Sequence, residues 1–268
     1  MTVLGRMPNA GLICSLTRRE VVGRYRGSLL GLLWSLLNPL FMLAVYTFVF
    51  GVVMRSRWSM PSGQEAHHST GEFAVILFCG LMVFQFFADV VSSAPGLIVA
   101  NVNYVKKIVF PIQILPVVST GAALFHAAVS LIVLLVFVYF VFGGVPLTVM
   151  LTPIVFAPLV VMVVGFAWIL AAIGVYFRDM SQIVQPLVTA SLFLAPIFFQ
   201  RSALPAWLQP YLSLNPLAIP VEAFRAVVIF GTQPNWTALG YYSLVAIAVA
   251  LVGEQFFQKT RRGFADVL

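Results

Sequence analysis

Long stretches without a charged side chain alternate along this chain with short segments that hold most of its charges. Residues 29–54, 180–200 and 236–253 are apolar runs, residues 73–91 form another that contains Asp89, and no charged residue occurs from Ile108 to Phe177. Gly143, Gly144 and Pro146 break this longest run near its middle. About 20 helical residues, each adding about 1.5 Å, cross the hydrocarbon core of a bilayer. The pattern predicts an all-α polytopic membrane protein with six transmembrane helices.

The whole chain, residues 1–268, reads as a single membrane domain. We place the spans at residues 29–54, 73–91, 113–142, 150–176, 180–200 and 236–256. Composition agrees, because 61% of the residues are hydrophobic and only 9% are charged, where soluble domains have about 25% charged residues. Cys14 and Cys79 lack the spacing of a redox or metal motif, so we expect no disulfide.

Two segments outside the spans also read as membrane-associated. Residues 10–26 mix apolar and cationic side chains directly before the first span, which predicts an N-terminal amphipathic interface helix, with a simple topogenic anchor as the alternative. Residues 203–232 are apolar but repeatedly interrupted by Pro and Gly. Since irregular backbone at membrane depth is tolerated where protein surrounds it, this stretch predicts a re-entrant helical hairpin between spans five and six.

The distribution of Lys and Arg residues predicts how the chain is oriented in the membrane. Of the 15 Lys and Arg residues, eleven fall on the side of the termini and four on the other side of the predicted spans. The excess predicts that both termini are cytoplasmic. The net charge of +7 is thereby explained by topology, and we expect no nucleic acid partner.

Few residues in this chain carry catalytic or ion-coupling chemistry. No GxxxxGK[ST] loop occurs, so any ATP is expected on another chain. The ionisable groups within the apolar runs are Asp89, near a span end, and His126, which we interpret as a packed helix residue. His67 and His68 lie in an outer loop without recognisable ligand spacing, so we expect no metal. The chain is therefore expected to be no enzyme and to bind no cofactor itself.

Polar side chains share one face in two of the spans. In the fifth span this face holds Gln182, Gln185, Thr189, Phe193, Pro196 and Gln200, and in the first span it holds Gly31, Ser35, Asn38, Met42 and Tyr46. Polar groups avoid lipid, so these faces look toward another helix or a channel. We interpret Gly31 and Ser35 as helix packing. Amides beside aromatic rings in the fifth span suit an uncharged, hydroxylated chain.

Four segments in order along the chain resemble the membrane subunit of type-2 ABC exporters that move O-antigen, capsule or teichoic-acid polysaccharides. They are RREVVGRYRGSLLGLLWSLLNPLFMLAVYTFVFG (18–51), NVNYVKKIVFPIQILP (101–116), YFRD (176–179) and NPLAIPVEAFR (215–225). The resemblance implies a bacterial inner-membrane homodimer with a channel between its copies, bound to two ATPase subunits that carry ATP and Mg²⁺. The cargo would be a lipid-linked polysaccharide moved from the cytoplasmic to the periplasmic side.

The resemblance also assigns roles to particular residues. Residues 101–111, which otherwise read as a docking segment or a plain loop, would couple the chain to the ATPase through Asn101, Tyr104, Lys106 and Lys107. The cytoplasmic mouth would be flanked by Arg18, Arg19, Arg24 and Arg26, and the cytoplasmic end of span four marked by Arg178 and Asp179. The channel-lining candidates come instead from the polar faces of spans one and five, and they are Asn38, Tyr46, Gln185, Thr189, Phe193 and Gln200.

In the re-entrant segment the resemblance points to Asn215, Glu222 and Arg225. Glu222 and Arg225 are spaced i, i+3 on a helix, so we expect the two charges to neutralise each other at depth. Two other functions stay open. One is export of a small molecule or drug on the same fold; the other is a membrane-embedded glycosyl- or acyltransferase, which would need a constellation of acidic and His side chains.

Overall fold

The structure, a computed structural model, describes residues 10–49, 70–106, 110–201, 205, 207, 209–212 and 214–268. Every regular element in these ranges is helical, and no strand occurs among them. Four stretches are long and apolar enough to cross a membrane: Gly71–Gly96, Ile112–Phe142, Leu147–Tyr176 and Trp236–Val267. The all-helical, polytopic class is thereby confirmed, and the count of six spans stays a prediction.

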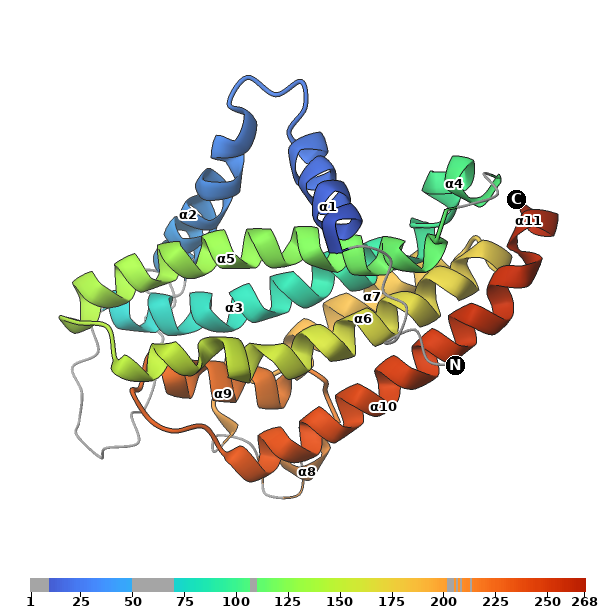
Figure 1. Ribbon diagram of the computed structural model, residues 1–268. Coiled ribbons are helices and arrows are strands. Elements are labelled where there is room, and N and C mark those ends of the chain that lie inside the picture. The colour runs from blue at the N-terminus through green and yellow to red at the C-terminus, as the bar shows by residue number, and fades with distance from the viewer. Residues whose placement is uncertain are drawn as a thin grey trace.

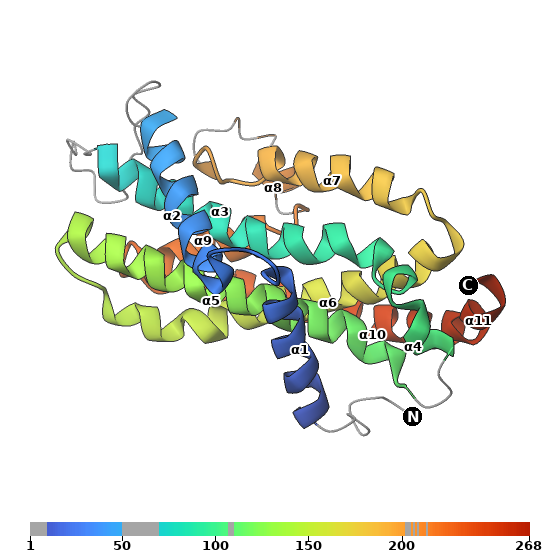
Figure 2. The ribbon, with the colours of Figure 1, turned by 90° about the horizontal axis from the view of Figure 1, so that it is seen from above.

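Helix α3 (Thr70–Ser93) is the interior element of the bundle. It lies between α5 (Leu115–Phe142) and α7 (Met180–Leu194), while α6 (Thr152–Tyr176) and α9 (Ala218–Val228) also pack on it (Figures 1 and 2). In its most apolar window 78% of the residues are buried, against 22% in the stretch that contains α5. This burial matches its sequence, which is hydrophobic except for a few polar side chains such as Gln85 and Asp89.

Helix α10 (Trp236–Thr260) packs along α6 over much of its length. The contact is close because glycines face it: a Cβ added at Gly165 would lie 2.8 Å from the Cα of Ala250, and Gly253 meets the backbone of Gly165. Small residues let helix backbones approach each other, which is how helices associate in lipid. The helix starts at Asn235, whose side chain accepts a hydrogen bond from the Ala238 amide at 3.0 Å.

Two apolar helices are shorter than the runs that predicted them. Helix α2 covers Trp34–Tyr46 within the predicted span 29–54, and α7 covers Met180–Leu194 within the predicted span 180–200. At about 1.5 Å per residue they extend about 20 and 22 Å, less than the hydrocarbon core. Helix α7 ends at Leu194, because the next residue, Ala195, has an extended backbone and precedes Pro196. Residues 50–69, with His67 and His68, lie outside the described ranges.

Helix α1 (Ala10–Arg24) contacts α5 beside the bundle (Figure 1). Its apolar and charged side chains are poorly segregated, so the amphipathic character predicted for residues 10–26 is weak. Val21 is its buried residue. A specific contact holds it, because Thr17 packs where a side chain at Gly121 of α5 would stand.

The end of the bundle that carries α4 (Val102–Lys106) also carries α11 (Phe264–Val267) and the C-terminus (Figure 1). Phe264 is fully buried against Phe257 and Tyr176. Gln113, in the 3₁₀ turn just before α5, links three segments: its carbonyl accepts from the Trp168 indole at 3.0 Å, and its side-chain oxygen accepts from Gln258 and Arg261. These bonds join α5, α6 and the end of α10.

The stretch predicted as re-entrant, 203–232, is described except for residues 203, 204, 206, 208 and 213. It contains α8 (Gln209–Leu212) and α9, which is largely buried against α3, α6 and α10. Aromatic rings mark this contact, since Phe156 of α6 lies 5.0 Å from Phe86 of α3 and 5.6 Å from Phe224 of α9 between ring centres. Short 3₁₀ turns lie at Gly31–Leu33, Ala94–Gly96, Val99–Asn101, Ile112–Ile114, Leu147–Leu151 and Arg261–Gly263.

Candidate functional site

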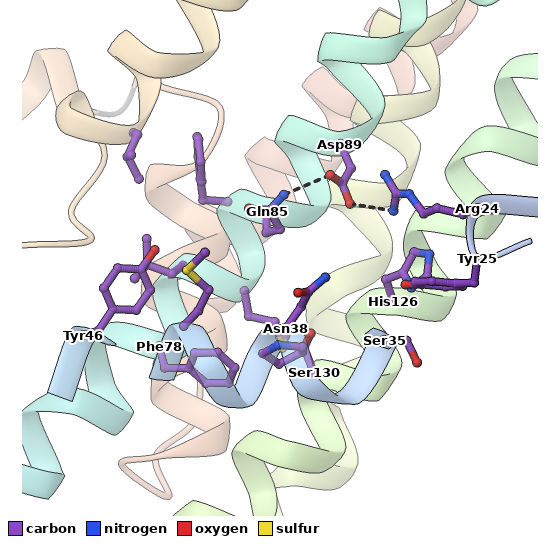
Figure 3. Close-up of a pocket in the computed structure, with 16 residues that line it drawn as sticks. Arg24, Tyr25, Ser35, Asn38, Tyr46, Phe78, Gln85, Asp89, His126 and Ser130 are labelled. Atoms are coloured by element: carbon purple, nitrogen blue, oxygen red, sulfur yellow. Dashed lines mark hydrogen bonds and ion pairs between the residues drawn. The ribbon is translucent and has the colours of Figure 1, made fainter. Parts of the chain in front are cut away.

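A cavity of about 530 Å³ lies between α2, α3 and α5, and residues at the end of α1 close one side of it (Figure 3). Nine of its lining side chains are polar: Arg24, Tyr25, Ser35, Asn38, Tyr46, Gln85, Asp89, His126 and Ser130. The rest are apolar and include Phe78, Met82 and Leu192 of α7. This volume is within the usual range of small-molecule sites, about 300–1,000 Å³.

An ion pair closes the polar end of the cavity. Asp89 of α3 faces Arg24, with 3.5 Å between carboxylate and guanidinium, and also accepts a hydrogen bond from Gln85 at 2.9 Å (Figure 3). Gln85 and Asp89 are four residues apart and therefore share a helix face. Nearby on α1, partial burial raises the pKa of the Glu20 carboxyl, an effect that Arg24 and Arg19 oppose. Arg24 is thus paired with Asp89 and lies near the Glu20 carboxyl.

His126 of α5 stands beside this pair. Its Nδ1 lies 3.3 Å from the Tyr25 hydroxyl, and the two rings meet edge to face. Its Nε2 is buried without a hydrogen-bond partner among the described residues. Buried polar atoms normally have a partner, so this nitrogen is an unsatisfied group inside the helix bundle.

Aromatic and apolar groups form the opposite end. Figure 3 shows Tyr46 and Phe78 away from the ion pair, with Asn38 and Ser130 between the two ends and Ser35 on the side of His126. Within the described part of the chain, neither the Asn38 amide nor the Ser130 hydroxyl makes a hydrogen bond. Of the six channel-lining candidates, Asn38 and Tyr46 therefore face this cavity.

The other four candidates lie on or beside α7, away from the cavity lining. Gln185, Thr189 and Phe193 are exposed on the surface of the chain, and Gln200 is partly exposed beyond the helix end. The Thr189 hydroxyl donates to the Gln185 carbonyl at 3.0 Å, while the Phe193 ring stacks on Phe198 at 5.8 Å. This face of α7 thus presents amides and rings outward, open to a partner or to solvent.

The structure joins two groups that the sequence analysis kept apart. Arg19 of α1 donates to the hydroxyl of Tyr104 in the coupling segment and lies 5.8 Å from the centre of its ring. Tyr104 also stacks on Phe110 at 4.2 Å. Helix α1 and the segment that contains α4 are therefore in direct contact.

The remaining cytoplasmic candidates have simpler surroundings. Arg18 and Arg26 are exposed, as are Arg178 and Asp179 in the turn between α6 and α7. The Asn101 amide donates to the Leu97 carbonyl at 2.9 Å. Lys106 ends α4 and its side chain lies outside the description, as does all of Lys107.

The re-entrant candidates anchor α9 to the end of α7. The Arg225 guanidinium is buried and donates to three backbone carbonyls, those of Ile76, Pro196 and Ile197. The Asn215 amide donates to the Ser191 carbonyl at 3.0 Å.

The expected ion pair between Glu222 and Arg225 is not the one that forms. Glu222 pairs with Arg201 at 3.9 Å, and Arg225 acts on it as a nearby charge. The physical reason is that Arg225 points into the protein, where the carbonyls at the end of α7 take its donors.

Several residues of the cavity were not identified from sequence as a site. Gln85 with Asp89, and His126 with Ser130, are spaced i, i+4 inside charge-poor spans. Each spacing places a polar pair on one helix face, and that signal was available. The sequence does not show that these faces of α3 and α5 line the same cavity. No group of three or more His, Cys, Asp or Glu side chains is placed to hold a metal in the residues the structure covers.

Comparison with known proteins gives one consistent picture. A family model described as ABC-2 type transporter matches residues 11–229. The chain is 31% identical over 261 residues to the O-antigen export system permease protein RfbA of Myxococcus xanthus, and 27% identical over 259 residues to an RfbA of Klebsiella pneumoniae; each alignment covers 96% of this chain and 95% of the relative. It is 26% identical over 244 residues, 90% of each chain, to the polysialic acid transport protein KpsM of Escherichia coli.

Proposed function

The chain belongs to the ABC-2 type transporter family, and on that premise we propose that it is the transmembrane subunit of an ATP-driven polysaccharide exporter. The family match agrees with the resemblance seen in the sequence. The observation that carries the proposal is the near full-length similarity to permeases whose names specify O-antigen export and polysialic acid transport. A transporter permease subunit is not itself an enzyme, and the ATPase is proposed on a separate subunit.

Two copies of this chain would form the transport path. The exposed face of α7, with Gln185, Thr189 and Phe193, and the cavity-facing side of α2, with Asn38 and Tyr46, supply the amide and aromatic groups that a glycan chain needs. Exposed polar groups on α7 would be unfavourable against lipid. A second copy with a wet channel between them removes that cost.

The chain would cross the inner membrane six times, with α2 and α7 as the two short spans and α9 within a re-entrant segment. Eleven of the 15 Lys and Arg residues would then lie in the cytoplasm together with both termini. The end with α4 and α11 would face the ATPase subunits. A glycan of many sugars on a lipid carrier is too large for one enclosed cavity, so a continuous path that opens in ATP-coupled steps is the simpler mechanism.

Coupling would pass through the contact between α4 and α1. Tyr104 receives a hydrogen bond from Arg19, so a displacement of the coupling segment would reach the helix whose end closes the cavity. We expect replacement of Tyr104, Lys106 and Lys107 by Ala to abolish co-purification of the ATPase. The exposed Arg262→Ala is the matched control at the same end of the bundle.

Deletion of the gene tests the function directly. We expect lipid-linked polymer to accumulate on the cytoplasmic face of the inner membrane and to be cleared when the wild-type chain is restored. Normal surface polysaccharide in the deletion strain would contradict polysaccharide export and leave export of a small molecule as the next candidate. A chain that purifies without any ATPase would favour the transferase instead.

A further inference from the structure

The end of helix α1 closes one side of the cavity and is held there by one face of the helix. This face consists of residues spaced i, i+4, i+7 and i+8, namely Thr17, Val21, Arg24 and Tyr25. Thr17 packs on Gly121, Val21 is buried, and the other two bond to α3 and α5. We propose that the Arg24–Asp89 ion pair is a releasable latch, which holds α1 across the polar end of the cavity and admits water when it opens.

The ion pair has the properties of a contact that opens. Arg24 and Asp89 lie 3.5 Å apart with 52% and 20% of their side chains exposed. Ion pairs in contact with water are weak, because the solvent screens them and hydrates both partners when they separate. Asp89 also keeps the hydrogen bond from Gln85 at 2.9 Å after Arg24 leaves. The Arg225 guanidinium, by contrast, is buried and fixed to three backbone carbonyls.

The packing beneath α1 is incomplete where the pair forms. A second cavity, of about 100 Å³, lies there, and its polar lining residues include Glu20, Arg24, Asp89, Ser119 and His126. This volume accommodates a few water molecules, since each takes about 30 Å³ in the liquid. Arg24, Asp89 and His126 also line the larger cavity, so the two spaces adjoin at the ion pair. Polar walls tolerate water when α1 moves away.

The connection after α1 lets the helix move as a unit. Gly27 and Gly31 have φ of 88° and 52°, in the left-handed region that glycine adopts readily, and no described atom lies within 4 Å of a Cβ added at either. The turn between α1 and α2 stands away from the bundle (Figure 1). Earlier in α1, Arg19 donates to the Tyr104 hydroxyl. A displacement of α4 therefore acts on α1 directly, and the helix yields at the ion pair.

The test measures how fast a charged, water-soluble methanethiosulfonate reagent reaches the cavity of the full-length chain in phosphatidylcholine nanodiscs. Ser130→Cys places a thiol in the cavity. Cys14 is exposed and gives the rate of an open site, whereas Cys79 is buried and reports loss of the fold. Peptide mass spectrometry follows each thiol separately. We expect the cavity thiol to react much more slowly than Cys14; equal rates would overturn the proposal, because the cavity would already be open.

Removal of either charge tests the pair itself. Arg24→Gln and Asp89→Asn should each speed modification of the cavity thiol roughly two- to fivefold, the effect expected from losing a partly exposed ion pair. Because both changes act on one contact, the double variant should react no faster than the quicker single variant. Lys259→Gln, at an exposed position of α10 outside the cavity, is the matched control and should leave the rate unchanged. Additive acceleration in the double variant, or none in either single variant, with Cys79 still protected, would refute the latch.

Addition of the ATPase tests whether coupling opens the latch, a step that rests on the proposed function. In the purified complex, ATP should speed modification of the cavity thiol, and Tyr104→Phe, which loses the bond from Arg19, should reduce this acceleration. A rate that ATP does not change would overturn opening by the ATPase.

The measurements on the chain alone separate the latch from the proposed function, because they need neither ATPase nor glycan. If they refute the latch, the transport function stands. If a deletion strain exports polysaccharide normally, the transport function is wrong, and the latch is still supported or refuted by the reaction of the cavity thiol.

Discussion

Arg225 gives the strongest test of how α9 and the end of α7 are held together. Its guanidinium is 3% exposed and donates to the carbonyls of Pro196 and Ile197 just beyond α7, and to that of Ile76 in α3. We consider the change Arg225→Leu, which keeps an apolar stem and removes all of these donors. Ile76 lies within a helix and keeps its helical hydrogen bond, so two carbonyls lose their partners.

Each buried carbonyl left without a donor lowers the free energy of unfolding by about 1–3 kcal/mol, so the two carbonyls together lower it by about 2–6 kcal/mol. Removing a buried charge recovers part of its desolvation penalty, which leaves a net loss of about 2–4 kcal/mol. For a chain of this size that corresponds to a fall of about 5–15 °C in the unfolding midpoint. The unfolding midpoint of Arg225→Lys should lie between those of the wild type and Arg225→Leu. The lysine ammonium keeps the charge but lacks the planar guanidinium that reaches several carbonyls at once.

Thermal unfolding of the purified full-length chain in detergent measures these shifts. Arg201→Leu is the control: Arg201 pairs with Glu222 at 3.9 Å with both side chains 39% exposed, and donates to the Gln209 carbonyl at 3.2 Å. Because this arginine is partly exposed, its loss should lower the free energy of unfolding by less than the loss of Arg225 does. Gly80→Ala provides an independent probe, since its new Cβ would lie 2.7 Å from the Arg225 guanidinium. If Arg225→Leu and Arg201→Leu unfold at the same temperature, Arg225 does not anchor the end of α7.

Three further changes test other contacts. Phe264→Ala removes a fully buried ring at the C-terminal end and should cost about 3–5 kcal/mol, measured as a lower unfolding midpoint and reduced ATPase co-purification. Gly253→Val forces a side chain against the backbone of Gly165 and should sharply reduce the amount of folded protein recovered from membranes, whereas Gly240→Val, at an open position of the same helix, should not. Tyr104→Phe keeps the ring stack but loses the bond from Arg19; we expect intact ATPase binding with lower transport-coupled hydrolysis, and unchanged coupling would count against the α1–α4 link.

The helical class and the long helices follow from the sequence because a charge-free run of 20 or more residues has few alternatives to a buried or lipid-facing helix. Helix α3 falls on the predicted run 73–91, and the break at Gly143 falls between α5 and α6, where Gly143 takes a left-handed conformation with φ of 76°. These are local features, and local pattern determines them.

The partners of polar side chains were not predictable in the same way. Arg225 bonds to carbonyls 28, 29 and 149 residues away, whereas sequence spacing offered only Glu222, three positions distant. His126 and Asp89 line one cavity because α3 and α5 turn particular faces toward each other. Helical spacing identifies a face, but packing against other helices decides which faces meet.

The bonds to Gln113 have a mechanical consequence. Because one residue links the segment before α5, the side of α6 and the tail of α10, we expect a push delivered at this end to be shared among three long helices. If the chain lines a transport path as proposed, we expect that path to widen mainly at the short helices α2 and α7, which these bonds do not fasten.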